Sequence, residues 1–162
     1  MFSLRGLFSL DFHPRKDSYD HAFLYLFIIS AVLRLIWLDK PPGLLIFDET
    51  YYVNVARILL RLPQQPDVWP NATPGIDSVN QEHPLLAKLM IAFSMSILGD
   101  NAWGWRIPSV VFGLLSIFVL YLLVKKASKD SLIALIATFV FSFDTLVFVH
   151  SRIATLDIFV LG

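Results

Sequence analysis

Apolar segments long enough to cross a membrane recur along this chain, separated by short polar stretches. Residues 21–38, 107–124 and 132–149 are apolar almost throughout, and another apolar run begins near 152 and continues to 162. An α-helix rises about 1.5 Å per residue, so such segments nearly match a hydrocarbon core of about 30 Å. The pattern predicts three membrane spans and the incomplete start of a fourth.

Two further helical segments lie between the first and second spans. Residues 48–62 alternate polar and apolar positions at helical spacing, which is typical of a helix on a membrane surface. Residues 84–98 are apolar almost all round, but their helix would reach only about 22 Å. The polar stripe of the first segment is Thr50, Asn54, Arg57 and Arg61, and its apolar stripe is Tyr52, Val55, Ala56 and Leu59.

Basic residues indicate how these segments are arranged. Short cytoplasmic loops are rich in lysine and arginine, and the loop 125–130 carries three lysines. If that loop and the segment 1–20 are both cytoplasmic, residues 84–98 cannot cross the membrane. The region 39–105 is then an outer loop with two in-plane helices, within a transmembrane domain formed by residues 21–162.

Composition agrees with a membrane protein. The chain is 56% hydrophobic and 16% charged, and its mean hydropathy is +0.65. The formal net charge is zero and no basic stripe is present, so nucleic acid is excluded as an expected partner. Arg34, about one turn from the far end of the first span, is expected to extend its head to the interface. Because the sequence ends within an apolar run, we expect a longer protein.

Asp48 and Glu49 are the first candidates for chemistry. These adjacent carboxylates begin the helix predicted after the first span. They are favourable at a helix N-terminus, where negative charge contributes about 0.3 to 1 kcal/mol. A carboxylate just outside a bilayer can also deprotonate a hydroxyl that a lipid-anchored reagent reaches, and the two tyrosines that follow favour this functional interpretation.

Other ionisable residues are predicted on the same face, and ionisable groups at membrane depth are usually functional. Several have simpler explanations. Lys88 could extend to the interface, Arg106 could be an ordinary interfacial arginine, His150 could be interfacial, and Asp144 could pair with Arg152 in a structural role. The candidates are Glu82, His83, Lys88, Arg106, Asp144, His150, Arg152 and Asp157. Glu82 and His83 could cap a helix or bind a metal.

Four ordered motifs resemble the protein O-mannosyltransferases, which belong to the GT-C class of polytopic glycosyltransferases. They are residues 47–52 (FDETYY), 83–88 (HPLLAK), 104–109 (GWRIPS) and 151–157 (SRIATLD). The resemblance runs from about Arg34 to Gly162. It implies an all-α membrane bundle of GT-C type with two in-plane juxtamembrane helices between the first and second spans.

The same resemblance implies a reaction and its residues. Mannose would pass, with inversion, from a polyprenyl phosphate to a serine or threonine hydroxyl of an acceptor protein outside the cytoplasm. The membrane would be the plasma membrane of a prokaryote or the endoplasmic reticulum of a eukaryote. Asp48 matches the family's catalytic carboxylate and Glu49 its neighbour. His83, Lys88, Arg106 and Arg152 are expected to bind the donor and its phosphate, and Asp144 and Asp157 to support the site.

Departures and alternatives remain. Leu85 replaces the second proline that usually follows His-Pro, and the family's later spans are not in this sequence. The remaining transmembrane part, membrane lipid, the lipid-linked sugar and the acceptor are the expected partners, and a divalent metal stays open. Another GT-C transferase, such as one moving aminoarabinose to lipid, a transporter subunit and a non-catalytic scaffold are the alternatives.

Leaving-group chemistry favours one base. A phosphate departs without protonation, whereas glycosidases need two carboxylates flanking the bond about 5 to 9.5 Å apart. Adjacent helical residues point about 100° apart, so Asp48 and Glu49 cannot flank one bond. The prediction is therefore a single base with a supporting neighbour, and the resemblance implies that the base is Asp48.

Overall fold

The computed structural model describes residues 18–63 and 85–161, and in these ranges every regular element is a helix. The first two are α1 (Ser18–Leu35) and α2 (Glu49–Leu59). They are followed by α3 (Leu85–Leu98), α4 (Ala102–Ser128), α5 (Ser131–Phe143), α6 (Thr145–His150) and α7 (Asp157–Leu161). The predicted all-α class is confirmed for this part of the chain.

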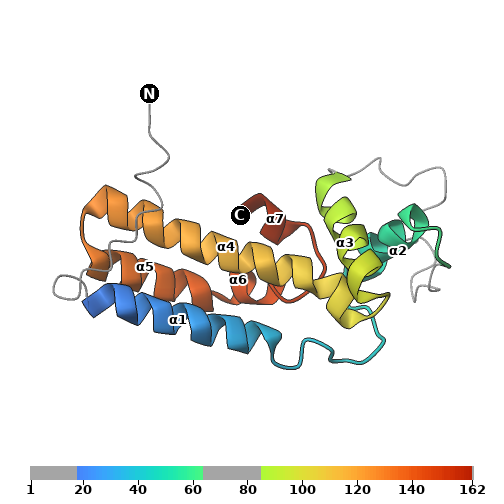
Figure 1. The fold of residues 1–162 in the computed structure, drawn as a ribbon, viewed down its shortest axis with the longest axis horizontal. Helices are drawn as coiled ribbons and strands as arrows, with labels where there is room; N and C mark the ends of the chain where they lie inside the picture. Colours follow the sequence, from blue (N-terminus) through green and yellow to red (C-terminus); the bar gives the residue numbers. More distant parts are fainter. Residues whose placement is uncertain (1–17, 64–84, 162) are drawn as a thin grey trace.

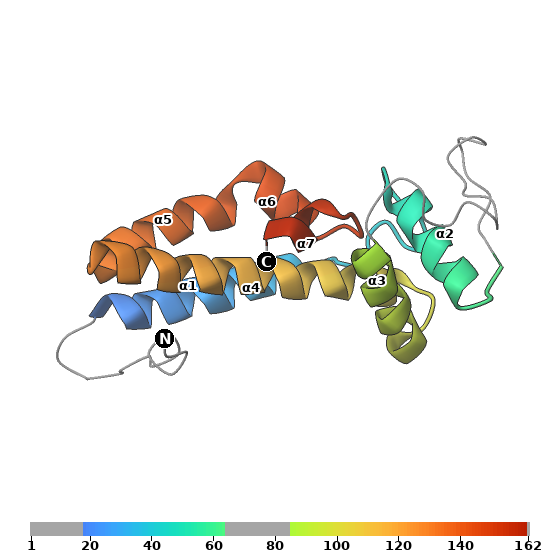
Figure 2. The same ribbon diagram turned by 90° about the horizontal axis from the view of Figure 1, so that it is seen from above.

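Helices α1, α4 and α5 lie side by side as an elongated bundle (Figures 1 and 2). Helices α2 and α3 lie together at the end where α4 begins, and α3 runs across the direction of α4 in both views. In the ranges described, α4 alone is both long and apolar enough to cross a membrane by itself. The first span was predicted at 21–38, and its helix ends earlier, at Leu35.

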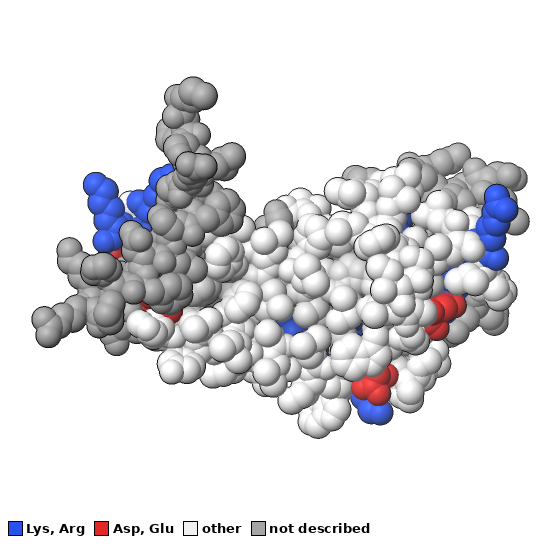
Figure 3. All heavy atoms as spheres, viewed as in Figure 1, with Lys and Arg blue, Asp and Glu red and all other residues white. Residues whose placement is uncertain are grey.

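The outer surface of the bundle is apolar. Figure 3 shows a face that is largely uncharged in the middle, with most acidic and basic side chains toward its two ends. Large apolar side chains such as Ile29 on α1, Leu123 on α4 and Val140 on α5 are more than half exposed. A surface of this kind suits contact with lipid or with further helices rather than with water.

Local sequence explains where α4 begins. Asn101 is its N-cap, and the side-chain oxygen accepts hydrogen bonds from the N–H groups of Trp103 and Gly104. A β-carbon on Gly104 would lie 2.1 Å from the Gly99 carbonyl oxygen, so only glycine fits this close turn. The turn holds α3 against the start of α4.

The segment predicted as a span at 132–149 is divided at Asp144. The carboxylate of Asp144 accepts hydrogen bonds from the N–H groups of Leu146 and Val147 and thereby caps α6. The expected pairing of Asp144 with Arg152 is not among the contacts of the described residues. Asp144 is exposed. A polar residue that can cap a helix, placed inside an apolar run, is the sequence signal for this break.

Helix α2 corrects the predicted polar stripe. Asn54 and Arg57 were expected to face outward, but both are buried. Arg57 forms a two-pronged ion pair with Asp100, at 2.8 and 3.0 Å, and the Trp105 ring N–H donates to the same carboxylate at 2.6 Å. These contacts bind Arg57 of α2 to the turn between α3 and α4. Part of the polar stripe is therefore buried, while Leu59 and Arg61 at the end of the two stripes stay exposed.

Candidate functional site

Glu49 and Arg106 form a buried ion pair at the start of α2. Both guanidinium-to-carboxylate distances are 2.8 Å, and neither side chain is more than 2% exposed. The same carboxylate accepts hydrogen bonds from the N–H of Ile46 at 3.0 Å and the N–H of Ala154 at 2.8 Å. Glu49 therefore ties together α2, α4 and the turn after α6.

Arg106 uses the rest of its guanidinium to hold the loop that precedes α2. It donates to the carbonyl oxygens of Leu38 at 2.7 Å, Lys40 at 3.0 Å and Leu44 at 3.3 Å. With the two bonds to Glu49, these contacts occupy all five N–H donors of the side chain. The expectation that Arg106 grips a phosphate directly does not fit this arrangement, since no donor is left for the anion.

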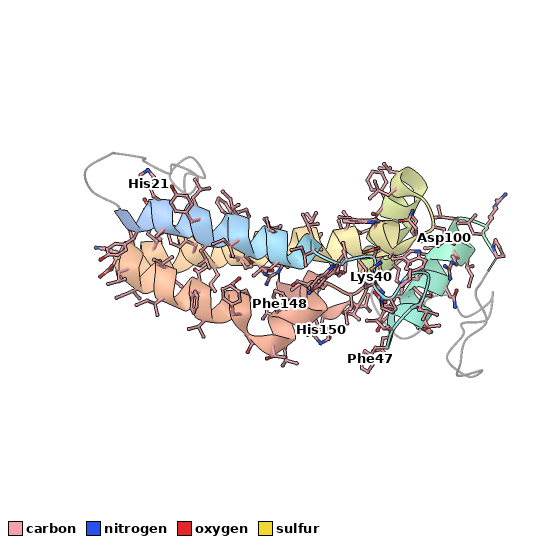
Figure 4. The ribbon with its side chains drawn as sticks, turned by 90° about the horizontal axis from the view of Figure 1, so that it is seen from below. His21, Lys40, Phe47, Asp100, Phe148 and His150 are labelled. Carbon is pink, nitrogen blue, oxygen red and sulfur yellow. The ribbon has the colours of Figure 1, made fainter. Side chains whose placement is uncertain are left out.

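Asp48, next to Glu49, has the opposite environment. It is exposed, and although it stands at the N-cap of α2, its side chain makes no capping hydrogen bond. No contact in the described ranges engages its carboxylate in a hydrogen bond or ion pair. The preceding Phe47 has a φ of 54° and is 75% exposed, and it points away from the body of the protein in Figure 4. A left-handed backbone at a non-glycine residue is strained, and such strain clusters at functional sites.

A pocket of about 190 Å³ lies between the loop before α2 and helix α6. Its cationic side chains are Lys40 and Arg152, with Arg106 also in the wall. The other lining residues are Trp37, Leu38, Ile46, Phe148, Val149 and Ile153. Sites for drug-sized ligands are typically about 300 to 1,000 Å³. This Arg152 pocket therefore suits a phosphate or a single small group rather than a whole lipid-linked sugar.

Arg152 lies in the turn between α6 and α7, where it is half-buried. One of its N–H groups donates to the Ile36 carbonyl, and its guanidinium lies 5.4 Å from the centre of the Phe148 ring. Burial lowers the pKa of Arg152 from its ordinary value, and the positive charge of Arg106 lowers that pKa further. An anion bound in the Arg152 pocket would relieve this repulsion.

The other predicted donor ligands lie elsewhere or outside the described ranges. Lys88 on α3 is buried, and its ammonium lies 5.6 Å from the centre of the Tyr51 ring. Lys88 therefore faces α2 and does not extend to the interface. Glu82 and His83, the residues considered for a metal, fall in the segment that is not described. Within residues 18–63 and 85–161 no three His, Cys, Asp or Glu side chains are grouped as a metal site would need.

His150 and Asp157 are brought together across the turn 151–156. The His150 ring nitrogen Nδ1 lies 3.0 Å from an Asp157 carboxylate oxygen and 3.1 Å from the Thr155 hydroxyl. This contact joins the end of α6 to the start of α7. It fixes the turn that carries Arg152 and Ala154.

Three groups of this site were not singled out from sequence. Lys40 and Phe148 line the Arg152 pocket, and the N–H of Ala154 binds Glu49. A backbone N–H carries no residue-type signal, so nothing in the sequence could have indicated Ala154. Lys40 could have been noticed as a cation between the first span and the Asp48 motif.

Comparison with known proteins shows which family and which proteins this chain is similar to. The family model described as dolichyl-phosphate-mannose-protein mannosyltransferase matches residues 82–161. A polyprenol-phosphate-mannose–protein mannosyltransferase of Corynebacterium glutamicum is 30% identical over 146 residues, which are 90% of this chain and 28% of that protein. Its counterpart in Mycolicibacterium smegmatis is 31% identical over 133 residues, 81% of this chain and 24% of that protein.

A second kind of transferase also matches. An undecaprenyl phosphate-α-4-amino-4-deoxy-L-arabinose arabinosyl transferase of Pseudomonas fluorescens is 29% identical over 116 residues, 71% of this chain and 20% of that protein. The chain thus spans between 20% and 28% of the length of these relatives. No solved structure matches the chain.

Proposed function

Because the chain belongs to the dolichyl-phosphate-mannose-protein mannosyltransferase family, we propose that it carries the catalytic base and part of the donor site of a membrane glycosyltransferase. The proposed reaction moves mannose from a polyprenyl phosphate to a serine or threonine hydroxyl of a protein. The rest of the enzyme would supply the site for the lipid tail and the recognition of the acceptor.

One observation carries the proposal, which is the contrast between two adjacent carboxylates. Glu49 is buried and bound by Arg106 and two backbone N–H groups, whereas Asp48 is exposed and its carboxylate has no partner within residues 18–63 and 85–161. Neighbouring carboxylates in different environments take different roles in enzymes. Asp48 is therefore the base, and Glu49 holds the backbone from which Asp48 extends.

The proposed transfer is a single displacement. Asp48 accepts the proton of the acceptor hydroxyl as the hydroxyl oxygen bonds to the anomeric carbon. The bond between that carbon and the phosphate oxygen breaks, and the electron pair leaves with the phosphate, so the sugar inverts. Cations beside the departing phosphate lower the barrier, and we assign that role to Arg152 with Lys40 on the rim of the pocket.

Two family reactions compete for this site, since the relatives include transferases for mannose and for aminoarabinose. Mannose is favoured because the two mannosyltransferases share more of this chain, 90% and 81% against 71%. The test is to purify the full-length protein and to supply each lipid-linked sugar with a serine-containing peptide or with a lipid acceptor. Mannosyl peptide is expected, and aminoarabinosyl lipid would replace the proposed substrate. No transfer from either donor would favour a scaffold or transporter.

The proposed active face is outside the cytoplasm. The motif at Asp48 and helix α3 lie at one end of the bundle, and the lysines at the C-terminal end of α4 lie at the other (Figure 1). We expect a membrane-impermeant thiol reagent on intact cells to label Gln81→Cys and not Lys126→Cys in the full-length protein. Lys126→Cys should react after permeabilisation, which is the control. Labelling of Lys126→Cys alone in intact cells would reverse the proposed topology.

A further inference from the structure

Arg34, in the last turn of α1, is fully buried and points into the bundle. This overturns the expectation that its head extends to the interface. Its Nε donates to the Ser151 hydroxyl at 2.8 Å, and one Nη donates to the Ser142 carbonyl at 2.9 Å. The other Nη donates to the hydroxyl and the carbonyl of Ser30. One guanidinium therefore joins α1 to the end of α5 and to the residue that follows α6.

The hydrogen bond from Arg34 to the Ser142 carbonyl follows from the position of Ser142 at the end of α5. Helix α5 stops at Phe143, so carbonyl groups of its last turn lack partners within the helix. Arg34 satisfies one of them, and the hydroxyl groups of Ser30 and Ser142 are 2.8 Å apart beside it. Arg34 thus occupies the break that Asp144 introduces between α5 and α6.

The charge of Arg34 has no carboxylate partner in residues 18–63 and 85–161. Burying a charge is costly unless other groups compensate it, and ionisable residues within membrane segments usually serve function. The hydroxyl and carbonyl oxygens around Arg34 compensate its positive charge only in part. An arginine held in this way needs an explanation beyond helix packing.

Two contacts lead from Arg34 to Arg152. The Arg34 guanidinium lies 5.0 Å from the centre of the Phe148 ring, and the Arg152 guanidinium lies 5.4 Å from the centre of the same ring. Ser151, which Arg34 binds, directly precedes Arg152 and is fully buried. A β-carbon at Gly113 of α4 would lie 2.4 Å from the Ser151 β-carbon, so Ser151 is pressed against α4 with no space to shift.

We propose that Arg34 is a positioning residue, which holds Phe148 and Ser151 so that Arg152 presents its guanidinium to the Arg152 pocket. The inference rests on the proposed function, because that function supplies the donor phosphate that Arg152 would bind. Arg34 does not touch the donor. It fixes the wall of the pocket on which Arg152 lies. The fork of the guanidinium is suited to this role because it reaches acceptors on three separate residues, which are Ser30, Ser142 and Ser151.

The test is a double-mutant cycle in the full-length enzyme, with kcat/KM for the lipid-linked donor as the readout. Arg34→Met is expected to lower this value by up to about 10²-fold, the size of effect that a remote misplacement of about 1 Å can have. Arg152→Ala is expected to lower it at least as much. The double variant should be no slower than Arg152→Ala, because residues that act through one another are not additive.

A matched control separates positioning from simple stability. Asp20, also buried on α1, is bonded to Lys125 at 2.6 and 2.7 Å at the far end of the bundle. Asp20→Asn is expected to lower the unfolding midpoint without changing the kcat/KM for the donor. If Arg34→Met does not fold, Ser151→Ala replaces it in the cycle, since it removes one bond of Arg34 and no buried charge.

The outcomes differ for the two proposals. Additive losses from Arg34→Met and Arg152→Ala, or a wild-type rate for both Arg34→Met and Ser151→Ala, would overturn the positioning role and leave the proposed function standing. A loss of donor kcat/KM in Asp20→Asn equal to that in Arg34→Met would also overturn it, since any weakening of α1 would then suffice. A wild-type rate for Arg152→Ala would remove the phosphate role of Arg152 and the positioning role with it.

Discussion

Asp48→Asn in the full-length enzyme is expected to slow sugar transfer by about 10² to 10⁴-fold while donor binding stays close to wild type. Asparagine keeps the size and the exposed position of Asp48 but cannot accept a proton from the acceptor hydroxyl. General base catalysis contributes about 10² to 10⁴-fold, so the chemical step should slow by that factor. Single-turnover transfer measures the step, and binding of the polyprenyl phosphate sugar to the purified protein measures the donor affinity.

Asp130→Asn is the matched control for this change. Asp130 is exposed, and it caps α5 at the opposite end of the bundle. Asparagine caps a helix about as well as aspartate, so this variant loses the same charge with little loss of stability. Transfer at the wild-type rate is expected for Asp130→Asn. If Asp48→Asn also turns over at that rate, the base is another group and the mechanism proposed here is wrong.

Glu49→Gln is expected to destabilise the protein strongly. The change leaves Arg106 buried without its counter-charge, and breaking a buried ion pair from one side costs about 3 to 5 kcal/mol. The glutamine NH₂ would also face the N–H of Ile46 or of Ala154, both of which now donate to Glu49. A large fall in the unfolding midpoint of the full-length protein in detergent should follow, with loss of activity as a consequence.

An exposed ion pair in the same loop provides the comparison. Asp39 and Lys40 are 3.2 Å apart, and their side chains are 43% and 59% exposed. Such surface pairs contribute no more than about 1 kcal/mol, so Asp39→Asn should barely change the unfolding midpoint. A Glu49→Gln protein that is as stable as wild type and yet inactive would contradict the structural role. It would make Glu49 a participant in the chemistry.

Much of the fold was accessible from the sequence because its determinants are local. Apolar runs, the spacing of stripes and the lysine-rich loop predicted helices close to α1, α4 and α5, and a pair of helices between the first two spans. The break at Asp144 was missed because the apolar run continues through it, and its cap was interpreted as an ion-pair partner. The polar stripe of α2 was misplaced because periodicity identifies faces but not what covers them.

The candidate site was likewise predictable from the sequence only in part. Sequence alone selected Asp48 and Glu49 as the chemical centre and, from leaving-group chemistry, required one base of the two. It did not assign a partner to Glu49, because Arg106 is 57 positions away and Ala154 is 105 away. Charge alone suggested that Arg106 binds phosphate, whereas its five donors are already bound within the protein.

What the sequence determined by itself is the all-α class, the apolar helices and the motif at Asp48, since these follow from patterns within a few turns of one helix. Only the tertiary structure decided that Glu49 is buried in an ion pair with Arg106, that Asp48 is exposed without a partner among the described residues, and that Arg34 turns inward against Ser151 and Phe148. Those properties depend on burial and on bonds between distant segments. Two carboxylates differ in chemistry according to whether the fold supplies them with hydrogen-bond and charge partners or leaves them exposed to solvent.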